Sequence, residues 1–288
     1  MSSPASVGMA MRRAVARLKA AGIAGAQNDV RVLMAAALGV DRGRLVFLAE
    51  EPLCPETAGR FADFVMARLA RRPVSQIIGR REFFGRRFRV TADVLDPRPE
   101  TETLVEAALS GPFERVLDLG TGSGAILLTL LAENPTAEGL GTDISPAALS
   151  VARENSSIMG IDRAKFILSD WYEAVRGRFD LIVSNPPYIP ASELAALPPE
   201  VRDHEPRMAL SPGNDSRGDG LAAFRVIAAG AAAHLRPGGR VIVEHGAGQG
   251  AAVAQIFRDA GFCGIVSVRD LDGRARVLGA RTSAAGRP

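Results

Sequence analysis

The sequence contains little cysteine, lysine or aromatic residue, and each scarcity excludes a class of function. The two cysteines, Cys54 and Cys263, lie far apart without ligand-like neighbours, so they indicate neither a disulfide framework nor a zinc site and suit a reducing cytosol. Basic residues number 35, yet only Lys19 and Lys165 are lysines. Because 32 acidic residues leave a net charge of just +3, charge alone does not indicate a nucleic-acid partner. No apolar run approaches the roughly 18 residues of a membrane span.

The length and composition predict two domains. At 288 residues, 47% of them hydrophobic, the chain can form a small core and a larger one. Residues 1–78 show apolar spacing near 3.6, which predicts a helical domain. Residues 79–98 contain two short extended pieces about Gly85, which predict a hairpin linker. Residues 99–288 would form the remaining, larger domain.

Strand and helix patterns alternate from about residue 100 onward. This alternation predicts an α/β fold in which a parallel sheet is covered by helices on both faces. Ligands of such sheets lie beyond the carboxyl ends of the strands, where the strand order reverses. We expect strands at 114–119, 138–142, 165–168, 180–184, 239–244, 264–269 and 275–280, with a turn at 236–239 before the fifth.

A glycine-rich turn follows the first of these strands. Asp118 is followed by Gly120, Gly122 and Gly124, and such glycines let the backbone approach a ligand at a helix N-terminus. The next strand ends at Asp143, roughly twenty residues later, where a ribose-binding acid is expected. The spacing lacks the third glycine position of the dinucleotide fingerprint, and no Gly-Lys-Ser/Thr follows for a nucleoside triphosphate. The turn resembles the first motif of the S-adenosylmethionine (SAM) methyltransferase superfamily.

The most informative residues are Asn185, Pro186, Pro187 and Tyr188, directly after a predicted strand. The prolines fix φ near −65° and donate no N–H, so the turn is stiff and rich in acceptors. Two acceptors, the Asn185 side-chain oxygen and the Pro186 carbonyl, suit the two hydrogens of a planar –NH2 group. Such hydrogen bonds would stabilise the partly cationic nitrogen of a methyl-transfer transition state. Tyr188 would pack on the flat face of the substrate group.

Each motif taken alone has a plainer interpretation. The Asn-Pro-Pro-Tyr segment could be a stiff surface turn, and the glycines could form an ordinary strand–helix connection. Asp143 could cap the helix that starts at Pro146, although Ser145 is the better candidate for that cap. Trp171, the single tryptophan, could belong to the core or line an adenine pocket. All these motifs follow strand ends at one edge of the predicted sheet, which indicates a binding site more than scattered structural residues.

Taken together, the motifs are typical of one particular family. Residues 98–102 (Arg-Pro-Glu-Thr-Glu), the turn 118–124, residues 185–188 and the pattern Glu-Pro-x-x-Ala-Leu at 205–210 resemble the protein-(glutamine-N5) methyltransferases of bacterial translation. The resemblance covers nearly the whole chain. It implies a Rossmann-like seven-stranded SAM methyltransferase sheet with an N-terminal helical domain. It further implies methylation of the glutamine in the Gly-Gly-Gln motif of class I peptide chain release factors.

The resemblance also implies a role for each matching residue. Residues 98–102 would close over the cofactor, and no metal is expected. The SAM-binding residues would be Gly120, Thr121, Gly122, Ser123, Gly124, Asp143, Trp171 and Asn185, and the glutamine-binding, catalytic residues Asn185, Pro186, Pro187 and Tyr188. Asp96, His245 and the long stretch 213–220 depart from the family pattern, which affects loop detail more than chemistry.

Two other functions stay open at this point. Asn-Pro-Pro-Tyr also serves enzymes that methylate adenine N6 or guanine N2, because these amines present the same planar –NH2. Such enzymes hold a strand and a flipped base, but only 5% of residues here are aromatic. The arginine-rich segment 68–89 is either a solvated face or a docking surface for an acidic protein or RNA. A SAM-binding module without activity would not need both motifs intact.

The helical domain 1–78 is expected to dock the substrate, since a second contact restricts which glutamines qualify. The expected partner is a class I release factor. We expect a cytoplasmic monomer with no stable nucleic-acid complex and no membrane association.

Overall fold

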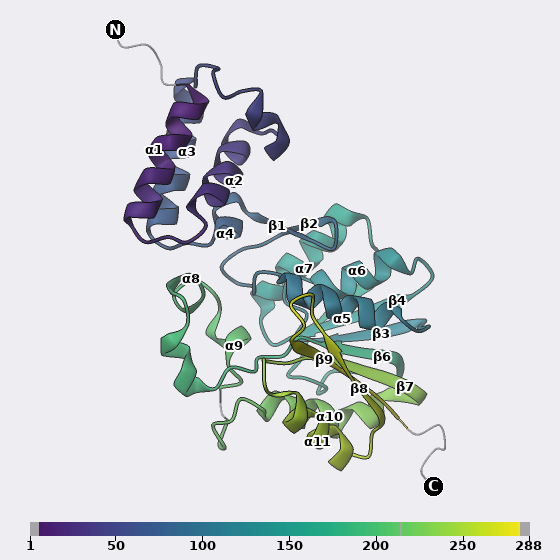
Figure 1. Cartoon of the computed structure of the whole chain (residues 1–288). Coiled ribbons are helices and arrows are strands. Elements are labelled where there is room, and N and C mark those ends of the chain that lie inside the picture. Colours follow the sequence, from purple (N-terminus) through teal and green to yellow (C-terminus); the bar gives the residue numbers. More distant parts are fainter. Residues whose placement is uncertain (1–5, 214, 283–288) are drawn as a thin grey trace. The chain divides into compact units, whose positions relative to one another are not determined.

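The computed structural model describes residues 6–213 and 215–282, which divide into two compact units (Figure 1). The first, called here the helical unit, contains the chain up to Gly79 and the separate segment Pro198–His204. The second, called the sheet unit, contains Arg80–Leu197 and the chain from Glu205 onward. The chain therefore leaves the sheet unit once and comes back to it, which the sequence pattern did not indicate.

Helices of the helical unit begin and end where local chemistry favours it. The Ser6 side chain accepts from the Met9 N–H and caps the first helix, while Pro55 occupies the first turn of another. Apolar residues at helical spacing, such as Ala14 and Leu18, are buried in a common core. The helices are α1 (Val7–Ala20), α2 (Ala26–Leu38), the 3₁₀ helix η1 (Arg42–Val46), α3 (Pro55–Leu69), α4 (Val74–Ile78) and α8 (Pro199–Arg202).

Ion pairs hold the returning segment within the helical unit. Arg68, whose side chain is 8% exposed, lies 2.7 Å from Asp29 and 3.0 Å from Glu200. Arg71 lies 3.3 Å from the same Glu200 oxygen. The Gln76 side chain donates to the His204 carbonyl at 2.9 Å. Because a charge left alone at such a buried site costs several kcal/mol, we expect these groups to act as a set.

The predicted hairpin joins β1 (Arg80–Phe83) to β2 (Arg86–Arg89). Phe84 and Gly85 form its two-residue turn with φ of 49° and 71°, as the twist of a tight hairpin requires. Phe83 and Phe88 are buried and meet edge to face in the core of the sheet unit. The hairpin is thus packed onto the larger unit.

One seven-stranded sheet runs through the described part of the sheet unit in the order β5-β4-β3-β6-β7-β9-β8. This confirms the predicted fold class. The expectation of a wholly parallel sheet was wrong, because β9 pairs antiparallel with both β7 and β8. A tight turn at 270–274 joins β8 to β9, and such turns connect only antiparallel strands. The strands are β3 (Arg115–Leu119), β4 (Glu138–Asp143), β5 (Ala164–Leu168), β6 (Phe179–Ser184), β7 (Leu235–Glu244), β8 (Cys263–Arg269) and β9 (Ala275–Arg281).

The turn expected at 236–239 lies inside β7, which corrects the prediction of a turn before the strand. Leu235 pairs with Phe179, and Arg240 pairs with Leu181, so the intervening residues form an irregularity in the ladder. Gly238 supplies a φ of 75° there. Pro and Gly indicate a turn locally, but the pairing with β6 continues around them.

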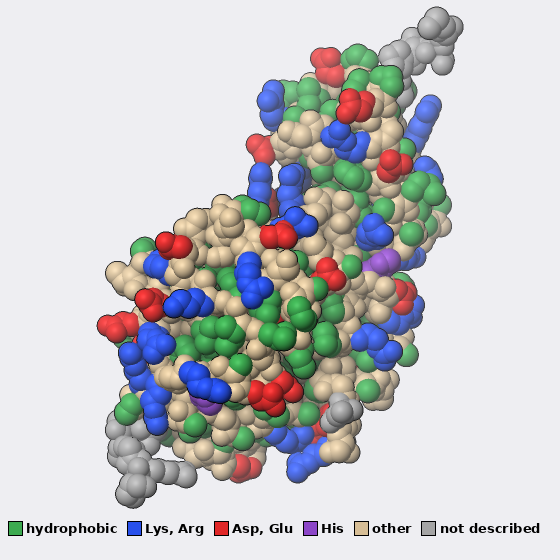
Figure 2. Space-filling view, turned by 180° about the vertical axis from the view of Figure 1, so that it is seen from behind, with side chains coloured by type: hydrophobic (Ala, Val, Ile, Leu, Met, Phe, Trp, Pro, Cys, Tyr) green, Lys and Arg blue, Asp and Glu red, His purple; other side chains and the backbone are tan. Residues whose placement is uncertain are grey.

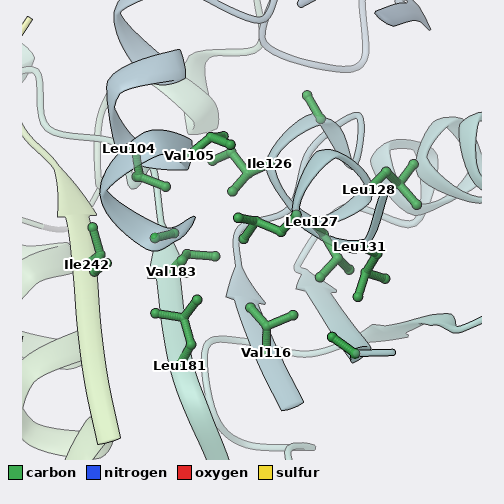
Figure 3. Packing of buried hydrophobic residues seen from close by; sticks show 14 of the residues in the cluster. Leu104, Val105, Val116, Ile126, Leu127, Leu128, Leu131, Leu181, Val183 and Ile242 are labelled. Carbon is green, nitrogen blue, oxygen red and sulfur yellow. The ribbon is translucent and has the colours of Figure 1, made fainter. Parts of the chain in front are cut away.

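Helices cover both faces of the sheet (Figure 1). Side chains alternate along each strand: Val116 and Leu181 point to one core, Leu117 and Ile182 to the other. Figure 3 shows the first core, where helices α5 and α6 pack on β3, β6 and β7. Full burial of each such Leu or Val contributes roughly 1.5–3 kcal/mol. The first face carries α5 (Pro99–Leu109), α6 (Ala125–Glu133) and α7 (Pro146–Met159), and the second α10 (Ala222–His234) and α11 (Gly250–Asp259).

The order of strands reverses between β3 and β6. From β3 the chain proceeds outward through β4 to β5, and then returns to place β6 on the other side of β3. The Ser184 hydroxyl donates to the Leu119 carbonyl at 2.7 Å and joins the ends of these two strands. Such a switch point is where an open α/β sheet binds its ligand. Between β6 and α10 lie η2 (Ala191–Ala196), α8 and α9 (Arg207–Leu210).

Candidate active site

A cavity of about 740 Å³ opens at the carboxyl ends of β3, β4 and β6, inside the sheet unit. Its volume lies within the roughly 300–1,000 Å³ of small-molecule sites. Each of the four sequence motifs contributes residues to its lining, namely 98–102, 118–124, 185–188 and 205–210. The lining comes from 93–95, Pro97, Arg98, Thr101, 120–123, Ala125, Ile126, 142–145, Ala148, 169–171, Asn185, Pro187, Ala191, Leu194, 206–209 and 211–213.

The glycine turn presents bare backbone to this cavity. Gly120 and Gly122 have φ of 71° and 55°, which side chains other than glycine rarely adopt. A Cβ added at either position would meet no atom within 4 Å, so both glycines border open space. Gly124 has a different role: it precedes α6, and a Cβ there would lie 3.1 Å from Leu128. It does not line the cavity, unlike Gly120, Thr121, Gly122 and Ser123.

Asp118 stabilises the glycine turn through a hydrogen bond with Thr121. Its side chain is fully buried and accepts a hydrogen bond from the Thr121 hydroxyl at 2.7 Å. Burial, above all, raises the pKa of Asp118 to about 7, and the nearby Asp143 charge adds to this effect. The other oxygen, Oδ1, has no hydrogen-bond partner among the described residues.

Asp143 connects β4 to the glycine turn. One carboxylate oxygen accepts from the Gly122 N–H and the other from the Ser145 N–H, each at 2.9 Å. Burial raises the pKa of Asp143, and these two hydrogen bonds oppose the rise. Ser145 caps α7 by accepting from the Ala148 N–H, as the sequence suggested. Because each carboxylate oxygen has a further lone pair, Asp143 retains the capacity to accept hydrogen bonds from a ligand at the cavity wall.

Trp171 stands in a strained conformation at the cavity. Its φ of 45° is unusual for a bulky residue, and such strain gathers at ligand sites. The Ser169 hydroxyl donates to the Trp171 carbonyl at 3.0 Å and holds this bend. The ring is half-buried, packs against the second core and lines the cavity, so its contact with an adenine stays a prediction.

Asn185 lines the cavity just beyond β6. Its side-chain Nδ2 donates to the Thr101 hydroxyl at 3.2 Å. Pro187 also lines the cavity, whereas Pro186 is buried and Tyr188 lies outside the lining. Burial raises the pKa of Tyr188, and the Tyr188 carbonyl accepts from Gln249 at 3.0 Å. Stacking of Tyr188 on a substrate therefore stays a prediction.

An ion pair between the partly exposed Arg98 and the buried Glu205 joins two borders of the cavity. Nη2 of Arg98 lies 2.7 Å from both carboxylate oxygens of Glu205, whose side chain is 1% exposed. Burial raises the pKa of Glu205 to about 7, Arg98 lowers it, and Asp96 raises it further. Residues 206–213, which follow directly, supply part of the lining.

Residues 98–102 divide between two tasks. Arg98 and Thr101 line the cavity, whereas Glu102 accepts from the Phe84 N–H at 2.7 Å and anchors the hairpin. Sequence reasoning missed the individual role of Thr101, although its motif was singled out. It also missed the loop 93–95 and Ile144, for which the sequence offers no signal.

The cavity chemistry fits an adenosine cofactor with an amino-acid tail. Open space at Gly120 and Gly122, the carboxylate of Asp143 and the flat ring of Trp171 are the groups such a ligand needs. Among residues 6–213 and 215–282, no group of His, Cys, Asp or Glu side chains is arranged to hold a metal ion. Over the same residues, no helix is long and apolar enough to cross a membrane.

Comparison with known proteins identifies the family. Residues 9–79 match the PrmC N-terminal domain and residues 92–196 the methyltransferase small domain. The release factor glutamine methyltransferase of Cereibacter sphaeroides is 58% identical over 96% of this chain and 98% of its own length. That of Rhodospirillum rubrum is 45% identical over 97% and 86%. A crystal structure of a methyltransferase from Pyrococcus furiosus shares the fold, with a TM-score of 0.54 at 16% identity over 77% of this chain and 98% of that one.

These matches confirm the predicted methyltransferase fold, and with it the expectation of an enzyme that uses SAM. The resemblance seen in the motifs extends over nearly the full length of both relatives. This chain belongs to the release factor glutamine methyltransferase family.

Proposed function

We propose that this protein transfers a methyl group from SAM to the side-chain amide nitrogen of the glutamine in the Gly-Gly-Gln motif of a class I peptide chain release factor. The observation that carries the proposal is the position of Asn185. Its amide lies at the cavity wall with Nδ2 engaged by Thr101, so Oδ1 is the side-chain atom left to accept from a substrate.

The cofactor would be held by residues that already line the cavity. The backbone of Gly120–Gly122 suits its amino-acid portion, Asp143 its ribose hydroxyls and Trp171 its adenine. When bound, SAM supplies an electrophilic methyl group on a sulfonium. Groups of this chain supply the binding of the cofactor, the orientation of the substrate and the stabilisation of the transition state.

The amide nitrogen of glutamine is a poor nucleophile because its lone pair is delocalised into the carbonyl. Oδ1 of Asn185 accepts one of its two hydrogens, and the carbonyl of Pro186, a buried residue next to the lining, is the acceptor predicted for the other. As the nitrogen becomes pyramidal and partly positive, these acceptors interact with it more strongly than with the planar amide. Pro186 and Pro187 make the acceptors rigid, so no reorganisation is needed during the reaction. A strong general base is not required, because the proton becomes acidic only as the methyl group arrives.

Methylation of a nucleic-acid base is less well supported. The arginine-rich segment that suggested it is largely engaged within the molecule. Arg81 lies 3.7 Å from Asp96, Arg86 2.5 Å from Glu133 and Arg89 2.8 Å from Glu154. Figure 2 shows basic and acidic side chains interspersed over one face. An interspersed surface does not attract a phosphate backbone as a continuous basic stripe would.

The helical unit would contact the release factor away from the reacting glutamine. Its surface exposes Phe47 at 83% and Val46 at 69%, which are large apolar side chains of the kind found at interface centres. A second contact of this type would select the release factor over other proteins with an accessible glutamine. The protein would act in the cytoplasm as a monomer.

Mass spectrometry tests the proposal directly. Purified protein and SAM are incubated with an intact release factor, and the peptide that contains Gly-Gly-Gln is fragmented. We expect one added methyl group on the glutamine side chain. A release factor that stays unmodified, or that carries the methyl group on another residue, would contradict the proposal.

A further inference from the structure

The turn Asn185–Tyr188 is held from outside the cavity by the side chain of Gln249. Its Nε2 donates to the Tyr188 carbonyl at 3.0 Å, and its Oε1 accepts from the Gly246 N–H at 2.9 Å. Gln249 is half-buried and does not belong to the lining of the cavity. One side-chain amide therefore joins the turn after β6 to the backbone after β7.

The fold brings these two segments together at adjacent strand ends. β6 and β7 are neighbours in the sheet (Figure 1), and Ser184, the last residue of β6, lies opposite Val243 in their parallel pairing. The chain continues into residues 185–188 after one strand and into residues 245–249 after the other. Gln249 ends the second segment as the N-cap of α11, so the start of this helix fixes the position of its backbone.

The orientation of the Gln249 amide follows from the backbone groups that it contacts. A backbone N–H only donates and a carbonyl only accepts, so Oε1 must face Gly246 and the NH2 must face Tyr188. The reverse orientation would place two donors together at Gly246 and two acceptors together at Tyr188. Glutamate cannot satisfy both contacts, because an ionised carboxylate only accepts.

The surroundings of the Tyr188 carbonyl are closely packed. A Cβ added at Gly220, whose φ is 71°, would collide with this oxygen. A Cβ added at Gly246 would lie 2.8 Å from Oε1 of Gln249 and 3.2 Å from the Tyr188 ring. No side chain fits at either glycine unless the carbonyl or the Gln249 amide moves.

The turn depends on contacts of this kind because its two prolines donate no N–H. Pro186 and Pro187 also fix their own φ at about −65°, and each restricts the backbone of the residue before it. The four residues therefore move as a stiff unit. A displaced Tyr188 carbonyl would displace the Pro186 carbonyl and the Asn185 amide with it. The hydrogen bond from Gln249 holds the far end of this unit.

We propose that Gln249 is a positioning residue that sets the Asn185–Tyr188 turn, and with it the two acceptors for the substrate amide. This inference rests on the proposed function, because those acceptors are the ones assigned to the glutamine of the release factor. Gln249 lies outside the cavity, so it acts through the backbone of Tyr188. Its replacement should lower the rate of methyl transfer without weakening the binding of SAM.

Gln249→Glu isolates the contact with Tyr188. The variant has nearly the same shape and keeps an acceptor for the Gly246 N–H, but it places a carboxylate oxygen against the Tyr188 carbonyl. We expect kcat with an intact release factor to fall about 10- to 100-fold, since a misplacement of about 1 Å can cost about 100-fold. The Kd of SAM, measured by equilibrium dialysis, should change less than about threefold.

The matched control for this variant is Gln255→Glu, which makes the same substitution at an exposed position of α11. Gln255 donates to Asp259 on the same helix and has no contact with the turn. Its kcat should therefore equal that of the wild type.

Gly220→Ala displaces the same carbonyl by a second route. The added Cβ collides with the Tyr188 oxygen, so kcat should again fall while the Kd of SAM changes less than about threefold. Gly218→Ala is the control for this variant. The φ of Gly218 is 67°, which imposes a similar backbone strain, but a Cβ there meets no atom within 4 Å. Gly218→Ala should keep its turnover.

Urea unfolding establishes which variants are folded under the assay conditions. A purely structural role predicts lower stability but an unchanged kcat in folded Gln249→Glu protein. That result, a loss confined to SAM affinity, or an equal loss of kcat in Gln255→Glu would overturn the inference. If Gln249→Glu does not fold, the comparison of Gly220→Ala with Gly218→Ala decides, and equal kcat values overturn it. Wild-type protein that leaves every release factor unmodified would instead overturn the proposed function itself.

Discussion

Nη2 of Arg98 lies 2.7 Å from both carboxylate oxygens of Glu205, although the two residues are 107 positions apart. The pair connects the start of α5, which carries Thr101, to the residue where the chain re-enters the sheet unit after Pro198–His204. Glu205 is nearly inaccessible, so its charge depends on Arg98 for compensation. This arrangement fixes both borders of the cavity with one interaction and gives stability a definite dependence on pH.

Stability should fall as pH rises, by an amount that depends on Glu205. The pKa of Glu205 is raised to about 7 in the folded protein from its ordinary value of 4.5. Between these values the folded state binds more protons than the unfolded state, so the free energy of unfolding decreases with rising pH. Glu205→Gln removes the part of this dependence that Glu205 contributes, while Asp118, whose pKa is also raised to about 7, keeps its own part. The free energy of unfolding, measured with urea at several pH values from 4.5 to 7, should therefore increase in the variant relative to the wild type as pH rises.

The matched control for this prediction is Glu154→Gln, which changes a half-exposed carboxylate paired with Arg89. The free energy of unfolding of Glu154→Gln should differ from that of the wild type by a nearly constant amount over the same pH range. A Glu205→Gln curve that runs parallel to wild type would show that Glu205 does not titrate in this window.

Removal of the Asn185 side chain should abolish turnover but leave the cofactor bound. Asn185→Ala removes an acceptor that interacts most strongly in the transition state, and losses of such groups cost about 10²–10³ in kcat. The cofactor would keep its contacts with the glycine turn, Asp143 and Trp171. Turnover and the Kd of SAM, measured on the same preparation, check this expectation. Substantial activity in Asn185→Ala would contradict the role assigned to this side chain.

Trp171 should contribute to cofactor affinity through its ring. Stacking of a base on an aromatic side chain is worth about 1–3 kcal/mol, so Trp171→Ala should weaken SAM binding by roughly 5- to 150-fold. Trp171→Phe retains a flat ring and should lose much less. Calorimetric titration with SAM measures both. Because Trp171 is the single tryptophan of the chain, its fluorescence in the wild type should also change when SAM binds. An unaltered Kd in Trp171→Ala would remove this residue from the adenine site.

Phe47 should matter for whole release factors but not for short peptides. Phe47→Ser removes an exposed apolar side chain of the helical unit and should raise the KM for an intact release factor about 10-fold, as for an interface centre. The KM for a Gly-Gly-Gln peptide should not change. Leu271→Ser is the control, since Leu271 is fully exposed on the sheet unit. Equal effects of Phe47→Ser on both substrates would argue against docking by the helical unit.

Local signals accounted for most of the fold. Buried strands such as β3 and β6 are nearly continuous apolar runs, and their predicted limits, 114–119 and 180–184, differ from the observed ones by one residue. The bulge at 236–239 escaped prediction because proline and glycine suggest a turn whether or not the neighbouring strand continues to pair. The membership of Pro198–His204 in the helical unit depends on contacts with Arg68 and Gln76, more than a hundred positions away.

The site likewise contains residues that a local motif indicates and contacts that no local sequence indicates. Gly120–Gly122 and Asn185 could be recognised because their chemistry is contained in a few consecutive residues. The hydrogen bond between Asn185 and Thr101 spans 84 positions. Nothing within either local sequence specifies the other partner. This contact exists only once α5 packs at the end of β6.

The most direct test of the central claim measures the transfer of tritium from labelled SAM. Purified protein is offered an intact class I release factor and, in parallel, tRNA, rRNA and duplex DNA. The account predicts label in the release factor, and its loss when the glutamine of Gly-Gly-Gln is replaced. Label in nucleic acid alone would contradict the account and identify a base methyltransferase with the same amine-binding turn. No label in any substrate, with SAM still bound, would contradict it in favour of a non-catalytic module.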